Sequence, residues 1–256
     1  FDFAALRRLH VIACGTASLA GMVGKYWFEK FAKLPVEWDI ASEFRYRDAP
    51  LLADEGALFI SQSGETADTL ACLRLCREVG MPTVGLVNVP ESSIAREASG
   101  VLRTLAGPEI GVASTKAFTT QLATLACLAL AAGRARGALA ERDLAAGLEA
   151  LASLPGSVRE ALGCAEQTRG IAETFGTVRD LLYIGRGVNY PIALEGALKL
   201  KEITYIHAEG YAAGELKHGP IALVDEQTPV VVVAPSDEVF AKTASNMQEV
   251  VARGGR

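Results

Sequence analysis

Short runs of apolar, often β-branched residues alternate with segments of helical length along the first 137 residues. Four such runs are His10–Cys14, Ala57–Ser61, Thr83–Asn88 and Val101–Leu105. Alternation of strand-length and helix-length segments predicts a parallel sheet that helices cover on both faces. Open α/β sheets bind ligands in the loops after the carboxyl ends of their strands, so functional residues are expected there.

The same order of segments returns later in the chain. The run Leu181–Ile184 enters a Gly-Arg-Gly turn, and Gly187 lies 172 positions after Gly15. A fixed offset of this size predicts a tandem repeat of one doubly wound fold, although α/β folds also resemble themselves by chance. We expect one domain over 1–137, a helical connection over 138–175 and a second domain over 176–256. A copy of the strand at Thr83 would begin near position 255, so the second domain is expected to be truncated.

Composition and charge exclude some classes of partner. The chain has 256 residues, 50% of them apolar, which suits two α/β domains. Its formal net charge is −5 and it holds no run of Lys or Arg, which argues against a nucleic-acid partner. The most apolar stretch, 121–133, is shorter than the roughly 20 residues that cross a bilayer, so no membrane partner is expected.

The cysteines and the first residues indicate the setting of the chain. Five cysteines make an odd set, most of them in apolar surroundings, which favours reduced thiols and the cytoplasm. Cys72 and Cys76 share a helix face, but no His lies near them in sequence, so no metal site is predicted. The chain opens on Phe1 without a signal peptide pattern, and we expect it to be a piece of a longer protein.

The first candidate site is the polar loop Ser61-Gln62-Ser63-Gly64-Glu65-Thr66, between a strand and a helical segment. Free amide groups at a helix start carry partial positive charge, so this loop offers an anion site to which Ser61, Ser63 and Thr66 add hydroxyl donors. The loop has no Lys or Arg, so a phosphate would depend on amides and hydroxyls. Glu65 and Asp68 lie close by, which argues against very tight anion binding. Alternatively, Ser and Gly turn the chain and Thr66 or Ser63 caps the helix.

Two further loops belong to the same predicted sheet edge. They are Cys14-Gly15-Thr16-Ala17-Ser18 and Gly111-Val112-Ala113-Ser114-Thr115-Lys116, and each precedes a helical segment. Convergence of three polar loops would enclose a small polyhydroxylated ligand with a phosphate at one end.

The second candidate site is a helix in the second domain. Glu195, Lys199 and Glu202 are spaced i, i+4 and i+7, which places all three on one helix face. An ion-paired solvent face would have the same pattern. Two of the three histidines, His207 and His218, follow in a stretch that is too Gly-rich and too polar to belong to the core. A histidine with a carboxylate can open a sugar ring and move a proton between adjacent carbons. A hydrogen-bonded loop histidine is the alternative.

Together these motifs resemble the tandem sugar isomerase (SIS) domains of the glutamine:fructose-6-phosphate amidotransferase family. The resemblance covers essentially the whole chain, and its longest parts are Glu109–Gln121, Glu195–Glu202 and Ala208–Pro220. The Ser61–Thr66 loop alone would indicate only the SIS superfamily. The resemblance implies a tandem SIS fold with its second domain truncated.

The resemblance also implies a role for each matching residue. Those that bind or line the sugar-phosphate pocket would be Thr16, Ala17, Ser61, Gln62, Ser63, Thr66, Val112, Ser114 and Glu195. Glu202 would move the proton between C1 and C2, His218 would assist ring opening in the neighbouring subunit, and Lys199 would supply supporting charge. Ala17 is a departure, since the family usually has Ser there, which removes one hydroxyl near the ligand.

The implied activity is conversion of fructose 6-phosphate and glutamine to glucosamine 6-phosphate by a homodimer. Fructose 6-phosphate, glucosamine 6-phosphate and glucose 6-phosphate are the expected ligands, and no cofactor is implied. The glutaminase domain and the imine-forming lysine of the family have no counterpart in this sequence. Alternatives are an ammonia-independent ketose/aldose phosphate isomerase or deglycase, and a sugar-phosphate-sensing regulatory module.

Overall fold

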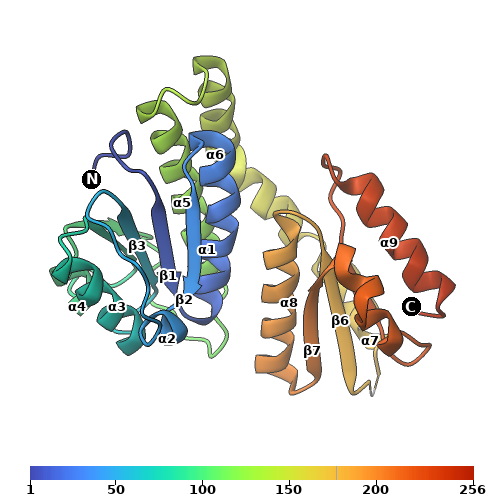
Figure 1. Cartoon of the computed structure of the whole chain (residues 1–256). Helices are drawn as coiled ribbons and strands as arrows, with labels where there is room; N and C mark the ends of the chain where they lie inside the picture. Colours follow the sequence, from blue (N-terminus) through green and yellow to red (C-terminus); the bar gives the residue numbers. More distant parts are fainter. Residues whose placement is uncertain (177) are drawn as a thin grey trace. The chain divides into compact units, whose positions relative to one another are not determined.

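The computed structural model describes residues 1–176 and 178–256. The chain forms two compact units, Phe1–Leu151 and Ala152–Arg256, and each is described by itself (Figure 1). The domain bounds expected from the repeat stay a prediction.

The first unit is built on a parallel sheet with the strand order β2-β1-β3-β4-β5. The strands are β1 Leu9–Ala13, β2 Val36–Ile40, β3 Gly56–Ser61, β4 Thr83–Val87 and β5 Gly100–Arg103. Strands β1, β3, β4 and β5 confirm the four runs expected from the sequence. Because all strands are parallel, the loops after β1, β3 and β5 begin at the same edge of the sheet.

Helices cover both faces of this sheet (Figure 1). They are α1 Gly15–Trp27, the π-helical segment η1 Phe28–Ala32, α2 Ala41–Phe44, α3 Ala67–Glu78, α4 Ser93–Glu97 and α5 Lys116–Ala135. Ile12 and Phe59 pack with α2, α3 and α4 in one core. On the other face α1 approaches so closely that a Cβ at Gly21 would lie 2.8 Å from Val11 Cγ1. The doubly wound fold is confirmed.

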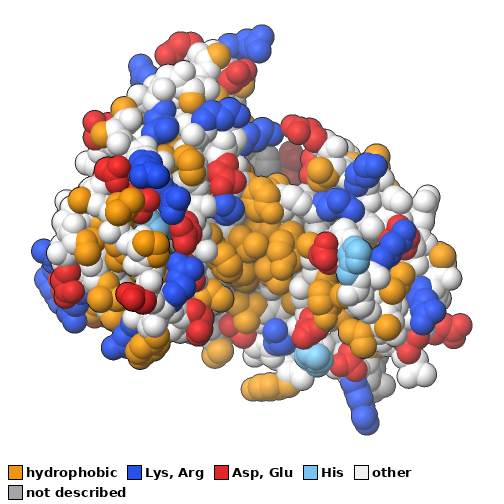
Figure 2. All heavy atoms as spheres, in the orientation of Figure 1, with side chains coloured by type: hydrophobic (Ala, Val, Ile, Leu, Met, Phe, Trp, Pro, Cys, Tyr) orange, Lys and Arg blue, Asp and Glu red, His pale blue; other side chains and the backbone are white. Residues whose placement is uncertain are grey.

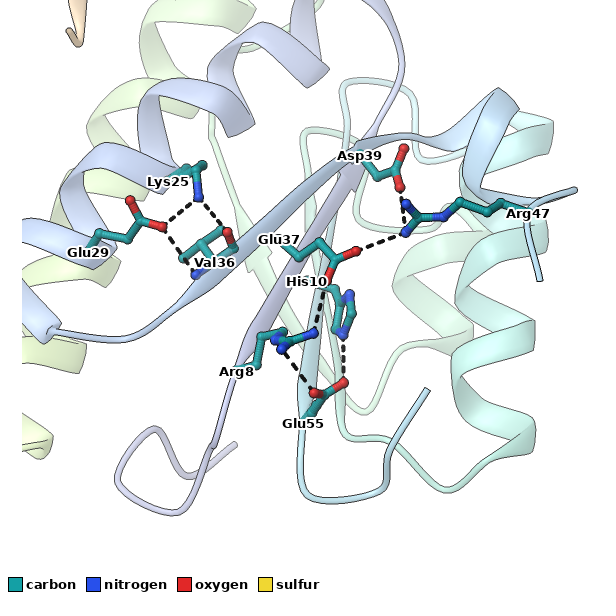
Figure 3. Close-up of polar contacts among 9 residues, drawn as sticks. All are labelled: Arg8, His10, Lys25, Glu29, Val36, Glu37, Asp39, Arg47 and Glu55. Carbon is teal, nitrogen blue, oxygen red and sulfur yellow. Dashed lines mark hydrogen bonds and ion pairs between the residues drawn. The ribbon is translucent and has the colours of Figure 1, made fainter. Parts of the chain in front are cut away.

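A polar network lies at the amino ends of β1 and β3, away from the loops that follow these strands (Figure 3). The buried ring of His10 contacts Glu55 through Nε2 and Oε2 at 2.7 Å. Arg8 and Arg47 donate to opposite oxygens of Glu37 at 3.0 and 2.9 Å. Burial pushes the pKa of Glu37 up, but the hydrogen bond from Arg47 and the charges of His10, Arg47 and Arg8 outweigh it and lower the pKa. These contacts connect the strands β1, β2 and β3.

Two helices follow the first unit's sheet: α6 Glu141–Leu162 and α7 Ala165–Glu173. Both fall in the stretch 138–175 that the sequence predicted to be helical. The division between the units lies inside α6.

The second unit has a parallel sheet with the order β7-β6-β8. Its strands are β6 Asp180–Gly185, β7 His207–Ala212 and β8 Val230–Val233, and its helices are α8 Asn189–Thr204, α9 Phe240–Ala252 and the 3₁₀ segments η2 Ala213–His218 and η3 Pro220–Leu223. Leu182 and Ile184 of β6 pack with Leu216, Val224 and Val250 on the α9 face. Helix α8 covers the other face, where a Cβ at Gly210 would lie 2.8 Å from Leu194 Cα.

Two details differ from the sequence-based expectations. The Gly-rich stretch from His207 was expected to lie outside the core, yet it begins as strand β7 with Ala208 fully buried, because its glycine lets α8 pack directly on the strand. Buried thiols were expected, and burial raises the pKa of Cys72 and Cys76 to about 12, but Cys127 and Cys164 are exposed.

Two further features are the distribution of charge on the surface and the length and apolar character of the helices. On the face drawn in Figure 2, Lys and Arg side chains are interspersed with Asp and Glu over both units. Among residues 1–176 and 178–256, no helix combines the length and the apolar character that crossing a bilayer requires.

Candidate functional site

The loop between β3 and α3 is shaped by its own hydroxyl groups. Ser61 ends β3 and is buried, and its Oγ lies 2.9 Å from Thr66 Oγ1 and accepts the amide of Gly64 at 3.0 Å. Ser63 Oγ accepts the amide of Glu65 at 3.2 Å. Thr66 is the N-cap of α3 but makes no side-chain cap hydrogen bond, so the alternative of Thr66 as a capping side chain does not hold. The start of α3 therefore faces hydroxyl groups that an anion can share.

The acidic residues beside this loop are occupied by other partners. Glu65 Oε1 accepts the amide of Ser93 at 2.7 Å, and this hydrogen bond lowers the pKa of Glu65. Asp68 accepts from Arg45 at 3.1 Å. The sequence suggested that Glu65 and Asp68 would weaken anion binding. Arg45 offsets the charge of Asp68, whereas Glu65 stays ionised beside a neutral amide, so one negative charge remains next to the loop.

Gly64 allows the close turn of the loop. Its φ is +65°, and a Cβ there would lie 2.0 Å from Ser92 Oγ. Its carbonyl accepts the amide of Ile94 at 3.0 Å, and the carbonyl of Gln62 accepts the amide of Asn88 at 3.1 Å. The loop is thereby fixed to the chain that follows β4.

The loop after β1 lies next to the loop after β3. Ala13 of β1 pairs with Ile60 of β3, so the start of α1, which carries Thr16 and Ala17, follows at the same level as Ser61. Thr16 and Ala17 are half-buried. Ser18 is buried, so its hydroxyl does not replace the one that Ala17 lacks.

The third loop precedes α5 and is held by polar contacts at both ends. Asn88 Nδ2 donates to Gly107 O at 2.7 Å, and Glu109 Oε2 accepts the amide of Ala117 at 3.1 Å. Ser114 is half-buried, whereas Val112 is 95% exposed. The structure therefore does not bury Val112 against the other two loops, and its role as a pocket wall stays a prediction.

A hollow of about 540 Å³ lies beside the loop Ser61–Thr66. Its lining includes Gln62, Asn88, Glu109 and Arg103, the last residue of β5. Sequence reasoning did not single out Arg103, because it lies far from Ser61 along the chain and belongs to no polar motif. The predicted strand Val101–Leu105 has Arg103 at its middle, so nothing in the sequence indicated that Arg103 would lie at the strand end beside the loop.

Helix α8 of the second unit brings together the three charged residues predicted from their spacing. Lys199 Nζ lies 3.5 Å from Glu195 Oε1 and 2.5 Å from Glu202 Oε2. The side chains of Glu195, Lys199 and Glu202 are 7%, 18% and 33% exposed. Glu195 and Lys199 are more buried than residues on a freely solvated face, but Glu202 is exposed, so the alternative of an ion-paired surface still applies to the Lys199–Glu202 pair. One ammonium group lies near two carboxylates and offsets only part of their charge.

The two histidines of the second unit differ in their surroundings. His207 lies on β7, with Nδ1 3.1 Å from Asp180 Oδ1 and Nε2 3.6 Å from Glu209 Oε1. These contacts give His207 a structural role between neighbouring strands. His218 ends η2 and is exposed, which leaves its imidazole accessible to a ligand.

Protein families and known proteins show what this chain is similar to. A family model described as the SIS domain matches residues 3–131 and 177–256. The chain belongs to the SIS domain family. This SIS chain is 63% identical over 256 residues to the glutamine–fructose-6-phosphate aminotransferase (isomerizing) of Bradyrhizobium diazoefficiens, and 58% identical over 255 residues to that of Brucella suis. In both cases it spans 42% of the relative's length.

Similar solved structures agree with this family assignment. The C-terminal domain of glucosamine-fructose-6-phosphate aminotransferase from Francisella tularensis is 49% identical to this SIS chain, with a TM-score of 0.97 over 99% of this chain and 72% of that one. Glucosamine-6-phosphate deaminase from Thermotoga maritima is 22% identical, with a TM-score of 0.80 over 98% and 75%. At that identity the second likeness shows the fold alone.

The structure brings some of the predicted residues of this SIS chain together as two groups, one in each unit, whereas Val112 is exposed and His218 lies on η2, outside the group on α8. The loops of Ser61–Thr66 and Thr16 share one sheet edge, and Glu195, Lys199 and Glu202 share one helix face. In the described part of the chain, no group of three His, Cys, Asp or Glu side chains is arranged to hold a metal ion.

Substitution of Gly64 tests the loop directly. Gly64→Ala places a methyl group against Ser92 at positive φ, and we expect it to lower the free energy of unfolding by about 1–3 kcal/mol and to weaken anion binding. Gly80→Ala is the matched control, because Gly80 also has positive φ but open space at its Cβ. Denaturant unfolding and sugar-phosphate titration measure both effects. Equal losses of binding in the two variants would show that the close turn is not needed.

Proposed function

We propose that this chain is the sugar-phosphate isomerising part of a glutamine–fructose-6-phosphate aminotransferase, which forms glucosamine 6-phosphate from fructose 6-phosphate and glutamine. The main support is the 63% identity to a protein of that name, in an alignment that covers the whole of this chain. Because the chain spans 42% of that relative, the complete reaction belongs to the longer protein.

In this proposal the loop Ser61–Thr66 binds the phosphate group. Hydroxyls of Ser61, Ser63 and Thr66, the side chain of Gln62 and the first amides of α3 are the donors. Thr16, Ala17, Val112 and Ser114 line the sugar. The hydrogen bonds among Ser61, Thr66 and Gly64 keep these donors in place before the ligand arrives, which reduces the entropy lost on binding.

The proton transfer is assigned to the group on α8. Glu202 takes a proton from C1 and returns it to C2, which converts the ketose skeleton to the aldose. Lys199 lies between Glu202 and Glu195 and offsets part of their charge, so both carboxylates can lie on the same helix face. His218 assists ring opening in the site of the neighbouring subunit of a homodimer, and the enzyme works in the cytoplasm.

The test is an assay of the full-length protein with fructose 6-phosphate. Formation of glucosamine 6-phosphate that requires glutamine supports the proposal. Conversion of fructose 6-phosphate to an aldose phosphate without glutamine would favour the ammonia-independent isomerase instead. Binding without any turnover would favour the sugar-phosphate-sensing module.

A further inference from the structure

A chain of polar contacts through α9 links the turn before α8 to the segment η2, both in the second unit. Asn246 is only 6% exposed, and both ends of its amide are engaged. Its Oδ1 accepts from Arg186 Nε and Nη2 at 3.2 and 3.1 Å, and its Nδ2 donates to Glu249 Oε2 at 3.1 Å. A buried amide is costly unless each polar atom is paired, so these contacts specify one arrangement of the three side chains.

The other oxygen of Glu249 extends the chain to η2. Glu249 Oε1 lies 2.8 Å from Lys217 Nζ, and Lys217 directly precedes His218. The hydrogen bond from Lys217 is the largest cause of the lowered pKa of Glu249, and those from Asn246 and the charge of Arg186 add to it. Because the pKa in the folded protein is lowered, the pair is intact at neutral pH and is lost as the pH falls through that lowered value.

Arg186 also contacts η2 directly. It lies between Gly185 and Gly187, in the turn that leads from β6 into α8. A Cβ at Gly214 of η2 would lie 3.1 Å from Arg186 Nη2, so the absence of a side chain there gives the guanidinium its place. Arg186 therefore lies beside Gly214 near the start of η2. Asn246 and Glu249 connect Arg186 to Lys217 near the end of η2.

We propose that Asn246, Glu249 and Lys217 are positioning residues, which hold the His218 segment in a fixed place on the second unit, from which His218 reaches the neighbouring subunit's site. This inference rests on the function proposed above for His218. The segment η2 needs such support, because in it only Ala213 and Leu216 are buried and the exposed His218 is followed by Gly219 at φ +140°. Misplacement of a catalytic group by about 1 Å can lower a rate by about 100-fold.

The test uses the full-length enzyme with fructose 6-phosphate and glutamine. Lys217→Met removes the charge and keeps the aliphatic stem, and we expect kcat to fall about 10- to 100-fold with little change in KM. Lys217→Arg keeps the ion pair and should retain most of the activity. The control is Lys242→Met, at an exposed lysine of α9 outside this chain of contacts, which should leave kcat unchanged.

A double substitution shows whether Lys217 acts through His218. In a His218→Ala background, Lys217→Met should lower kcat no further, because the group that it positions is gone. Additive losses, or a normal kcat in Lys217→Met while His218→Ala is impaired, would overturn the positioning role and leave the proposed function intact. A normal kcat in His218→Ala would instead contradict the proposed role of His218, and with it this inference.

Discussion

Glu202→Gln in the full-length enzyme is expected to lower kcat by about 10²- to 10⁴-fold, the range of a lost general acid–base group. Gln is nearly the same size as Glu but cannot take a proton from C1. The substitution also removes one of the two ion pairs of Lys199, which keeps its contact with Glu195. Formation of glucosamine 6-phosphate under saturating substrate measures the effect.

A matched control shows whether loss of a carboxylate outside the proposed site changes kcat. Glu160→Gln makes the same change at an exposed position of α6, and its kcat should equal that of the unsubstituted enzyme. The KM for fructose 6-phosphate should change little in Glu202→Gln, because the proposal places the phosphate in the loop after β3. A Glu202→Gln enzyme with normal kcat would exclude Glu202 as the proton carrier.

Glu55→Ala is expected to lower the free energy of unfolding of the first unit by about 3–5 kcal/mol, as for other buried ion pairs that lose one partner. The Glu55 side chain is 2% exposed and lies 2.7 Å from His10 and 3.6 Å from Arg8 (Figure 3). Its removal leaves His10 buried beside a cavity. Urea unfolding followed by the fluorescence of Trp27 and Trp38, both in this unit, measures the loss.

The neighbouring residue provides the control for Glu55. Asp54→Ala removes an exposed carboxylate one position earlier and should change the free energy of unfolding by less than about 0.5 kcal/mol. A loss of less than about 1 kcal/mol for Glu55→Ala would mean that the His10–Glu55 contact adds little to the stability of the sheet.

The fold could be predicted from the sequence where apolar runs are uniform. Strands β1, β3, β4 and β5 were found because buried parallel strands are continuously apolar. Strand β2 was missed because it is an edge strand with Glu37 and Asp39 among its five residues, so its pattern is half polar. Strand β7 was missed because Gly210 and Glu209 are atypical of strands, and only the packing of α8 explains the glycine.

The candidate site was predictable where spacing along one element fixes the geometry. Glu195, Lys199 and Glu202 share a face through the helical period, and Ser61 to Thr66 form one loop. Contacts between distant segments were not predictable: the bond of Asp68 to Arg45, the place of Arg103 beside Gln62, and the contacts of Asn246 all depend on tertiary packing. None of these pairs has a signature in the local sequence.

A crystal structure of the full-length protein with bound fructose 6-phosphate tests the central claim most directly. We predict that the phosphate oxygens lie about 2.5–3.2 Å from the hydroxyls of Ser61, Ser63 and Thr66 and from the first amides of α3. A phosphate bound elsewhere, for example in the hollow beside Arg103 with the Ser61–Thr66 loop unoccupied, would contradict it.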